Sequence, residues 1–343
     1  MLIAAAAEVQ SSAYGDFGDY HEFVSEAVRK ISAVAMTDKR RTREGLGQTA
    51  EKLLARMEKV QLGQIVSRVP TGISKLDRLM RGGMARGHLV VPCGLTSMGK
   101  SSWAFQVAFR GAEQRHVHAL IFSLEMSREE ALVKGAASLS KVGTEMFQNL
   151  PGEKVDWDNV NAIMARAVAQ EARIRIEEHR SIGEIVAVSH AWHADLPPLP
   201  DGSPPPAVIL VDHLQKVIGV RSKNSNRQEE VWGVAQDLKN LAKDLEVPVV
   251  APGQLDNDAA KEKRAPRIGD MRDSKAIEHE ADVVLGIHRN RLEAEGRCEM
   301  ILLKHRGGRV GKRTVTWRGE WQGFEDPASD DVPPDEMEPE DFR

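Results

Sequence analysis

Hydrophobic and polar positions divide this chain into a helical leader followed by a long alternation of strands and helices. Apolar residues recur at helical spacing over residues 23–34 and again over residues 53–60. Two such helices cannot bury a core of their own, so their apolar faces should pack either on the following domain or on another subunit. The pattern predicts a helical linker or oligomerisation segment over residues 1–67.

Short apolar runs separated by helical patterns extend from residue 68 to residue 325. Strands are expected at His88–Cys93, Ala119–Glu125, Ala207–Asp212, Val247–Ala251 and Cys298–Arg306, and helices at Ser102–Phe109, after a capping box at Ser127–Glu130, and at Arg227–Glu246. Uninterrupted apolar runs of this length are typical of strands that are buried on both faces of a parallel sheet. Glycines at 307, 308 and 311 then lead into Thr314–Arg318, which predicts a hairpin. We therefore expect an α/β domain with a mainly parallel sheet, flanking helices and a C-terminal β-hairpin.

Composition excludes some classes of protein. The 343 residues include two cysteines, Cys93 and Cys298, too few for a disulfide framework or a zinc site. No apolar run is long enough to cross a bilayer, and the first residues lack the features of a signal peptide, so we expect a cytoplasmic protein without a membrane partner.

Charge is unevenly distributed along the chain, whose net charge is −4. Residues 326–343 contain eight acids and one arginine, and this acidic, proline-containing tail is expected to be disordered. Residues 286–313 instead carry eight lysines or arginines and three glutamates. Such a basic segment suits contacts with phosphates, although a solvated edge strand would have the same composition.

The most informative motif is a complete phosphate-binding loop between the first long strand and its helix. Its candidate nucleotide contacts are Gly94, Leu95, Thr96, Ser97, Met98, Gly99, Lys100, Ser101 and Ser102. Glycines let the backbone wrap around a phosphate, and the helix N-terminus adds partial positive charge. Lys100 would neutralise the β- and γ-phosphates, and the Ser101 hydroxyl would bind Mg²⁺. The motif predicts a nucleoside triphosphatase.

Three further polar residues follow the ends of expected strands, where ligands of open α/β sheets bind. Asp212 ends an apolar run and would deliver a carboxylate to the Mg²⁺ shell. Glu125 could polarise the attacking water, or could serve only as a favourable charge at a helix N-terminus. Gln254 could hydrogen-bond the γ-phosphate and report the nucleotide state, although in isolation it would pass for a loop residue.

Lys304 and Arg306 lie two positions apart on an expected strand and should share one face, with His305 on the other. Two cations beside a glycine-rich turn could reach a phosphate across a subunit boundary. An ordinary solvent-facing pair would show the same spacing.

Taken in order, these segments resemble the carboxyl-terminal ATPase domain of DnaB-type replicative helicases, which are hexameric rings with a RecA-like core. The resemblance covers about residues 68–325 and is carried by Pro70–Asp77, Ser97–Ser101, Phe122–Met126, Ala137–Val142, Val211–Gln215, Leu238–Lys243, Gln254–Leu255, Asp270–Ser274, Ile277–Asp282 and Lys304–Arg306. Of these, the Ser-Leu-Glu-Met element within Phe122–Met126 is the more specific, because many ATPases share the phosphate-binding loop.

The resemblance implies an ATP-dependent DNA helicase that uses Mg²⁺ and forms a homo-oligomeric ring, a hexamer, around single-stranded or forked DNA. It implies that Glu125 is the catalytic carboxylate, Asp212 the metal-side acid and Gln254 the sensor. Lys304 and Arg306 would act on the neighbouring subunit's ATP. The DNA-binding residues would be Arg272, Asp273 and Lys275, on a loop that lines the central channel. A helicase loader or other replisome proteins are the further partners it suggests.

Several features depart from the family pattern. The amino-terminal primase-interacting domain has no counterpart, which leaves primase stimulation in doubt, and residues 1–67 match only the linker region with its helix. His213 stands where the family usually has tyrosine, and Lys275 replaces a usual glycine. Two other functions fit the same residues: a RecA-like recombinase or recombination mediator that forms filaments, and a non-translocating ATP-binding ring that acts as a platform for another helicase.

Overall fold

The computed structural model describes residues 45–62, 67–147, 155–199, 202–219, 227–255, 264–270, 274–290 and 295–327, together with isolated positions before residue 30. Of the first helix expected from the sequence, over residues 23–34, only residues 23, 26, 27 and 29 are described, and of the acidic tail, residues 326–343, only 326 and 327.

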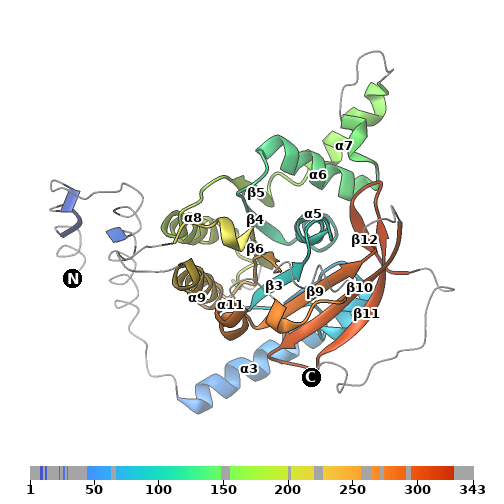
Figure 1. Ribbon diagram of the computed structural model, residues 1–343. Helices are drawn as coiled ribbons and strands as arrows, with labels where there is room; N and C mark the ends of the chain where they lie inside the picture. Colours follow the sequence, from blue (N-terminus) through green and yellow to red (C-terminus); the bar gives the residue numbers. More distant parts are fainter. Residues whose placement is uncertain are drawn as a thin grey trace.

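A twisted sheet forms the centre of the molecule (Figure 1). Its strands are β3 (Leu89–Gly94), β4 (His118–Ser123), β5 (Ile174–Glu177), β6 (Ala207–Asp212), β7 (Val249–Val250), β8 (Gly253–Gln254), β9 (Val283–Arg289), β10 (Glu295–His305), β11 (Gly311–Arg318) and β12 (Gly323–Glu325). They lie in the order β12-β11-β10-β9-β3-β7-β6-β4-β5, with β8 also beside β3. Pairing is parallel from β5 to β9 and antiparallel from β9 to β12. The predicted parallel sheet with a C-terminal hairpin is confirmed.

Helices cover both faces of this sheet (Figure 1). They are α3 (Leu46–Gln61), α4 (Ser74–Leu79), α5 (Lys100–Arg115), α6 (Arg128–Ser140), α7 (Trp157–Val168), α8 (Ile182–Ala194), α9 (Arg227–Leu245) and α11 (Ser274–Glu280), with 3-10 turns η1 (Thr144–Phe147), η2 (Leu214–Lys216) and η3 (Ile268–Asp270). Helices α5 and α6 lie over one face, and α8, α9 and α11 over the other. A small antiparallel pair, β1 (Arg68–Val69) with β2 (Met84–Ala85), precedes the phosphate-binding loop.

Two apolar clusters, one on each face of the sheet, make up the core. On β3, Val90 packs with Phe105 of α5, whereas Leu89 and Val91 pack in the cluster that contains Leu238 of α9. This alternation follows from the two-residue period of a strand. Fully burying one such side chain stabilises the fold by about 1.5–3 kcal/mol. The uninterrupted apolar runs in the sequence therefore favour a sheet that is covered on both faces.

The helix that follows β4 begins at the capping box that the sequence predicts. Ser127 Oγ accepts a hydrogen bond from the Glu130 N–H at 3.2 Å, and the Glu130 carboxylate accepts one from the Ser127 N–H at 2.8 Å. This reciprocal pair satisfies two backbone donors that an uncapped helix would leave open. The start of α6 is thereby fixed just beyond Glu125.

Two expected strands are shorter in the structure. Strand β4 ends at Ser123, two residues before Glu125, and β7 is confined to Val249–Val250. Prolines lie on either side of β7, at 248 and 252, and proline has no N–H to continue a ladder. Gln254 consequently lies on a separate short strand, β8, which pairs with the end of β3.

The C-terminal strands pack beneath the phosphate-binding loop. Gly99 has a φ of 98°, and a Cβ there would lie 2.7 Å from ring atoms of both Trp317 and Phe324. The backbone of Phe324 exchanges two hydrogen bonds with the Gln106 side chain on α5, each of 2.8 Å. Glycine at 99 is therefore required by its conformation and by this close packing as well as by the phosphate.

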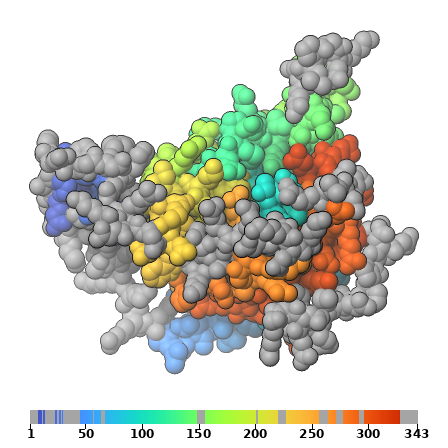
Figure 2. Space-filling view, in the orientation of Figure 1, coloured from blue at the N-terminus to red at the C-terminus, as the bar shows by residue number. Residues whose placement is uncertain are grey.

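Helix α3 presents its apolar face to the exterior. Leu54 is 65% exposed, and Leu53 and Met57 are also more than half exposed. In Figure 2 this helix (light blue) lies along the lower edge of the molecule. Leu53 and Met57 line a hollow together with Arg68 and Lys243 of the following domain, and both alternatives for this face stay predictions.

Both cysteines lie in the interior of the protein. Cys93 and Cys298 are both free and buried, and burial raises the pKa of each thiol to about 12. Both are therefore protonated at neutral pH and unsuited to nucleophilic chemistry. Among the described helices, none is long and apolar enough to span a bilayer.

Candidate active site

The phosphate-binding loop connects β3 to α5 and forms one wall of a cavity of about 1000 Å³. Lys100 begins α5, is only 5% exposed, and donates hydrogen bonds from Nζ to the carbonyl oxygens of Gly94 and Leu95 at 2.9 and 3.0 Å. These contacts hold the ammonium inside the loop. The backbone N–H groups at the start of α5 and this buried cation together make the cavity attractive to phosphates.

Ser101 lines the cavity and contacts the buried carboxylate of Asp212. The hydroxyl Oγ of Ser101 donates a 2.7 Å hydrogen bond to Asp212 Oδ1. The aspartate ends β6, where its neighbour on β4 is Ser123, and it is almost completely buried. A hydroxyl and a carboxylate are hard oxygen ligands, and Mg²⁺ is usually bound by one or two protein oxygens together with substrate phosphates and water. The residues present therefore fit magnesium.

Glu125 lies at the edge of the same cavity, on the connection between β4 and α6. Its carboxylate oxygens lie 3.3 Å from Nε2 of His213 and 3.4 Å from Nζ of Lys216. Both partners come from the segment that follows β6. Because the Glu125 side chain is 40% exposed, its carboxylate is accessible to water. The first turn of α6 also contains two acidic residues of its own, Glu129 and Glu130.

Gln254 also lines the cavity. It pairs with Gly94 at the end of β3, and its backbone N–H donates a 3.3 Å hydrogen bond to the side chain of Gln215. The neutral amide of Gln254 thus lies next to the phosphate-binding loop, where it could hydrogen-bond the γ-phosphate.

Other residues of the cavity were not identified from the sequence. Arg289, at the end of β9, donates a 2.6 Å hydrogen bond to the Ser97 carbonyl oxygen and lies 4.3 Å from the centroid of the Trp317 ring. Lys134 of α6 lines the cavity as well; burial lowers the pKa of its ammonium, opposed by the carboxylates of Asp212 and Glu125. Arg289 lies at the end of the strand beside β3, and this position could have indicated from the sequence that it lies at the site. No comparable sequence feature indicates a role for Lys134.

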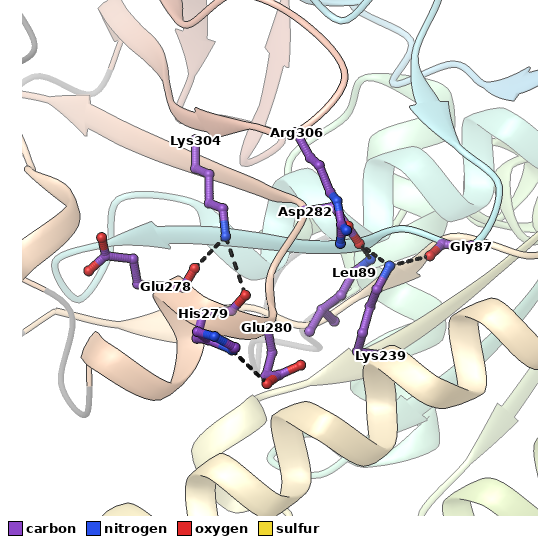
Figure 3. A network of polar contacts seen from close by, with 9 residues as sticks. All are labelled: Gly87, Leu89, Lys239, Glu278, His279, Glu280, Asp282, Lys304 and Arg306. Atoms are coloured by element: carbon purple, nitrogen blue, oxygen red, sulfur yellow. Dashed lines mark hydrogen bonds and ion pairs between the residues drawn. The ribbon is translucent and has the colours of Figure 1, made fainter.

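Lys304 and Arg306 lie on one face of β10 and its continuation, with His305 buried on the other, as expected from their spacing. Neither cation lines the cavity. Lys304 Nζ donates hydrogen bonds to the carbonyl oxygens of Glu278 and His279, the latter at 3.4 Å, and partial burial lowers its pKa. Figure 3 shows these contacts at the C-terminus of α11.

Arg306 contacts Asp282, which is the centre of a second group in Figure 3. Nη1 of Arg306 lies 3.3 Å from Oδ1 of Asp282, whose other oxygen accepts hydrogen bonds from Lys239 and from the Leu89 N–H. Burial disfavours the charged carboxylate, but these hydrogen bonds keep the pKa of Asp282 below its ordinary value. The Arg306 side chain remains 68% exposed, so its guanidinium can leave Asp282 at little cost.

The expected DNA-binding residues are only partly within the described part of the chain. Arg272 and Asp273 lie outside it, and for Lys275 the structure gives the backbone, in the first turn of α11, but not the side chain. Their role therefore stays a prediction.

Comparison with known proteins gives consistent matches over this arrangement. Residues 68–326 match the family described as DnaB-like helicase C terminal domain. The replicative DNA helicase DnaB of Geobacillus stearothermophilus is 30% identical to this chain, the match covering 94% of the chain and 71% of the relative. DnaB of Pasteurella multocida is 29% identical, with 94% and 70% covered. Among solved structures, that of a DnaB-like replicative helicase superimposes with a TM-score of 0.72 at 21% identity, covering 95% of this chain and 75% of that one.

Proposed function

This chain belongs to the family of DnaB-like helicase C terminal domains, and from that premise we propose that it is an ATP-dependent replicative DNA helicase. It hydrolyses ATP, forms a homo-oligomeric ring, a hexamer, and translocates on single-stranded DNA to unwind the duplex at a fork. The observation that carries the proposal is the convergence of Lys100, the Ser101–Asp212 pair and Glu125 on one cavity. Helicase loaders and other replisome proteins are the partners that this family suggests.

Each residue of the cavity has a distinct part in ATP hydrolysis. Lys100 leaves the loop carbonyls to bind the β- and γ-phosphates, and Ser101 with Asp212 would hold magnesium, which neutralises phosphate charge when bound. Glu125 orients the attacking water and accepts its proton. Gln254 contacts the γ-phosphate and loses that contact after hydrolysis, so that the two nucleotide states differ in structure.

Lys304 and Arg306 act on the ATP of a neighbouring subunit. The support is that neither lines the cavity of its own chain, although both lie at the carboxyl end of β10 and Arg306 is largely exposed. The exposed apolar face of α3 supplies a second intersubunit contact, because an uncovered face of this kind is typical of an interaction surface.

The test is an assay of ATP hydrolysis and of forked-duplex unwinding on the same preparation. We expect single-stranded DNA to stimulate hydrolysis and a forked duplex to be unwound only with ATP present. ATP binding without DNA-stimulated turnover would instead indicate a platform. Strand exchange by open filaments, without unwinding, would indicate a recombinase.

DNA binding should weaken steeply with salt, because cationic residues such as Arg272 and Lys275 displace counterions from the DNA backbone. For single strands each phosphate contact contributes about 0.7 to the slope of log K against log salt. Replacing Lys275 by alanine should therefore lower the slope by about 0.7, as measured by fluorescence anisotropy between about 50 and 200 mM salt. The matched control is Lys243→Ala, at an exposed position near the end of α9. A flat dependence on salt would contradict backbone tracking.

A further inference from the structure

His213 follows Asp212 at the carboxyl end of β6 and lines the same cavity as the phosphate-binding loop. Its ring lies against two carboxylates. Nε2 is 3.3 Å from Oε2 of Glu125 and 3.8 Å from Oδ1 of Asp212. The side chain is only 12% exposed, so this contact is largely shielded from solvent.

The other ring nitrogen indicates which tautomer is present. Nδ1 of His213 is buried and has no hydrogen-bond partner among the described residues. A proton on Nδ1 would leave a buried donor without an acceptor, and would also leave Nε2 as a bare lone pair facing two carboxylates. The proton on Nε2 avoids both costs. His213 therefore directs an N–H toward Glu125.

Among the described residues, few other contacts restrain Glu125. It lies beyond the end of β4, and the backbone just before it is held by the 3.0 Å hydrogen bond from the Leu124 N–H to the Asp212 carbonyl oxygen. Lys216 faces the other carboxylate oxygen, but that lysine is 57% exposed and is screened by solvent. The shielded imidazole is the stronger of the two restraints.

We propose that His213 is a positioning residue for ATP hydrolysis, holding one oxygen of Glu125 so that the carboxylate faces the attacking water. The proposal rests on the catalytic role proposed above for Glu125. Catalytic contacts are often long before substrate binds and shorten afterwards, so the 3.3 Å separation is expected to close to a hydrogen bond.

The oxygen of the water forms the new bond to the γ-phosphorus, the bond from that phosphorus to the β–γ bridging oxygen breaks, and the proton of the water passes to Glu125. His213 keeps its Nε2 proton throughout. Its contribution is to the orientation of Glu125, which matters because a small misplacement of a catalytic group has a large cost in rate.

Two substitutions separate positioning from packing. In His213→Phe an apolar ring of similar size replaces the imidazole, which removes the N–H and also the unpartnered Nδ1. We expect kcat for ATP hydrolysis to fall about tenfold to a hundredfold, with KM for ATP, the affinity for a fluorescent ATP analogue and the melting temperature almost unchanged. His213→Gln, whose side-chain N–H₂ can occupy the place of Nε2, should recover most of the rate. A packing role would instead lower the melting temperature of the Phe variant and would give no rescue by Gln.

A double-mutant cycle with Glu125→Gln completes the test. If His213 acts through Glu125, adding His213→Phe to Glu125→Gln should cause no further loss, because coupled residues are not additive. Multiplying effects, or a fully active His213→Phe enzyme, would overturn the inference. Full activity of Glu125→Gln alone would instead contradict the proposed role of that carboxylate, and this result is distinguishable from the other two.

Discussion

Replacement of Lys100 by alanine should abolish ATP hydrolysis. The ammonium is buried within the loop and bonded to two carbonyl oxygens, which it would leave to bind the β- and γ-phosphates. Removing a fixed cation that stabilises developing phosphate charge costs at least about a hundredfold in rate. Initial rates of phosphate release at saturating ATP would measure the loss.

The control for this experiment is Lys100→Arg, which retains the charge. The lysine is only 5% exposed, and a guanidinium is planar and larger than an ammonium, so we expect arginine to restore little activity. Circular dichroism should show both variants folded, because Lys100 lines the cavity and water can enter the space that its ammonium leaves. Turnover at the parental rate by a purified alanine variant would contradict the site.

Replacement of Arg306 by alanine should remove most ATP hydrolysis while leaving the subunit folded. An arginine that reaches a transferring phosphate from a neighbour is worth about 10³–10⁵ in rate. Folding should be spared because Asp282 keeps its hydrogen bonds from Lys239 and from the Leu89 N–H, and the Arg306 contact is a largely exposed ion pair.

Mixing the two inactive variants tests whether the arginine acts between subunits. A Lys100→Ala subunit still carries Arg306, and an Arg306→Ala subunit still has an intact phosphate-binding loop. Mixed rings therefore contain some complete sites, and turnover should rise with mixing ratio to a maximum near equal amounts. Either variant mixed with itself is the control. If mixed oligomers form and no activity returns, the arginine does not act in trans.

Sequence patterns identify the parts of the site that depend on neighbouring residues. The loop around Lys100 follows one continuous apolar strand, and Asp212 ends another. The sequence pattern therefore predicts where both lie, at the carboxyl ends of their strands. The sheet class follows from the same runs. Pairing of β4 with β6, which brings Ser123 beside Asp212, is the expected arrangement of parallel strands that end at the same edge.

Other contacts depend on docking between distant elements, which a sequence pattern does not contain. The contact of Arg289 with Ser97 joins residues 192 positions apart. Lys134 faces the cavity only because α6 packs on α5, and helical spacing alone gives no direction for it. The spacing of Lys304 and Arg306 predicts their shared face but not the α11 carbonyls that Lys304 binds, because α11 is a separate element.

The packing of Trp317 and Phe324 against Gly99 has a consequence for protein synthesis. The loop that binds nucleotide is translated in the first third of the chain, yet the side chains that support it are among the last of the domain to be made. The Asp326 carboxylate also accepts hydrogen bonds from the N–H groups of Ser74 and Lys75. A nascent polypeptide on the ribosome can complete this support only after nearly the whole domain has emerged.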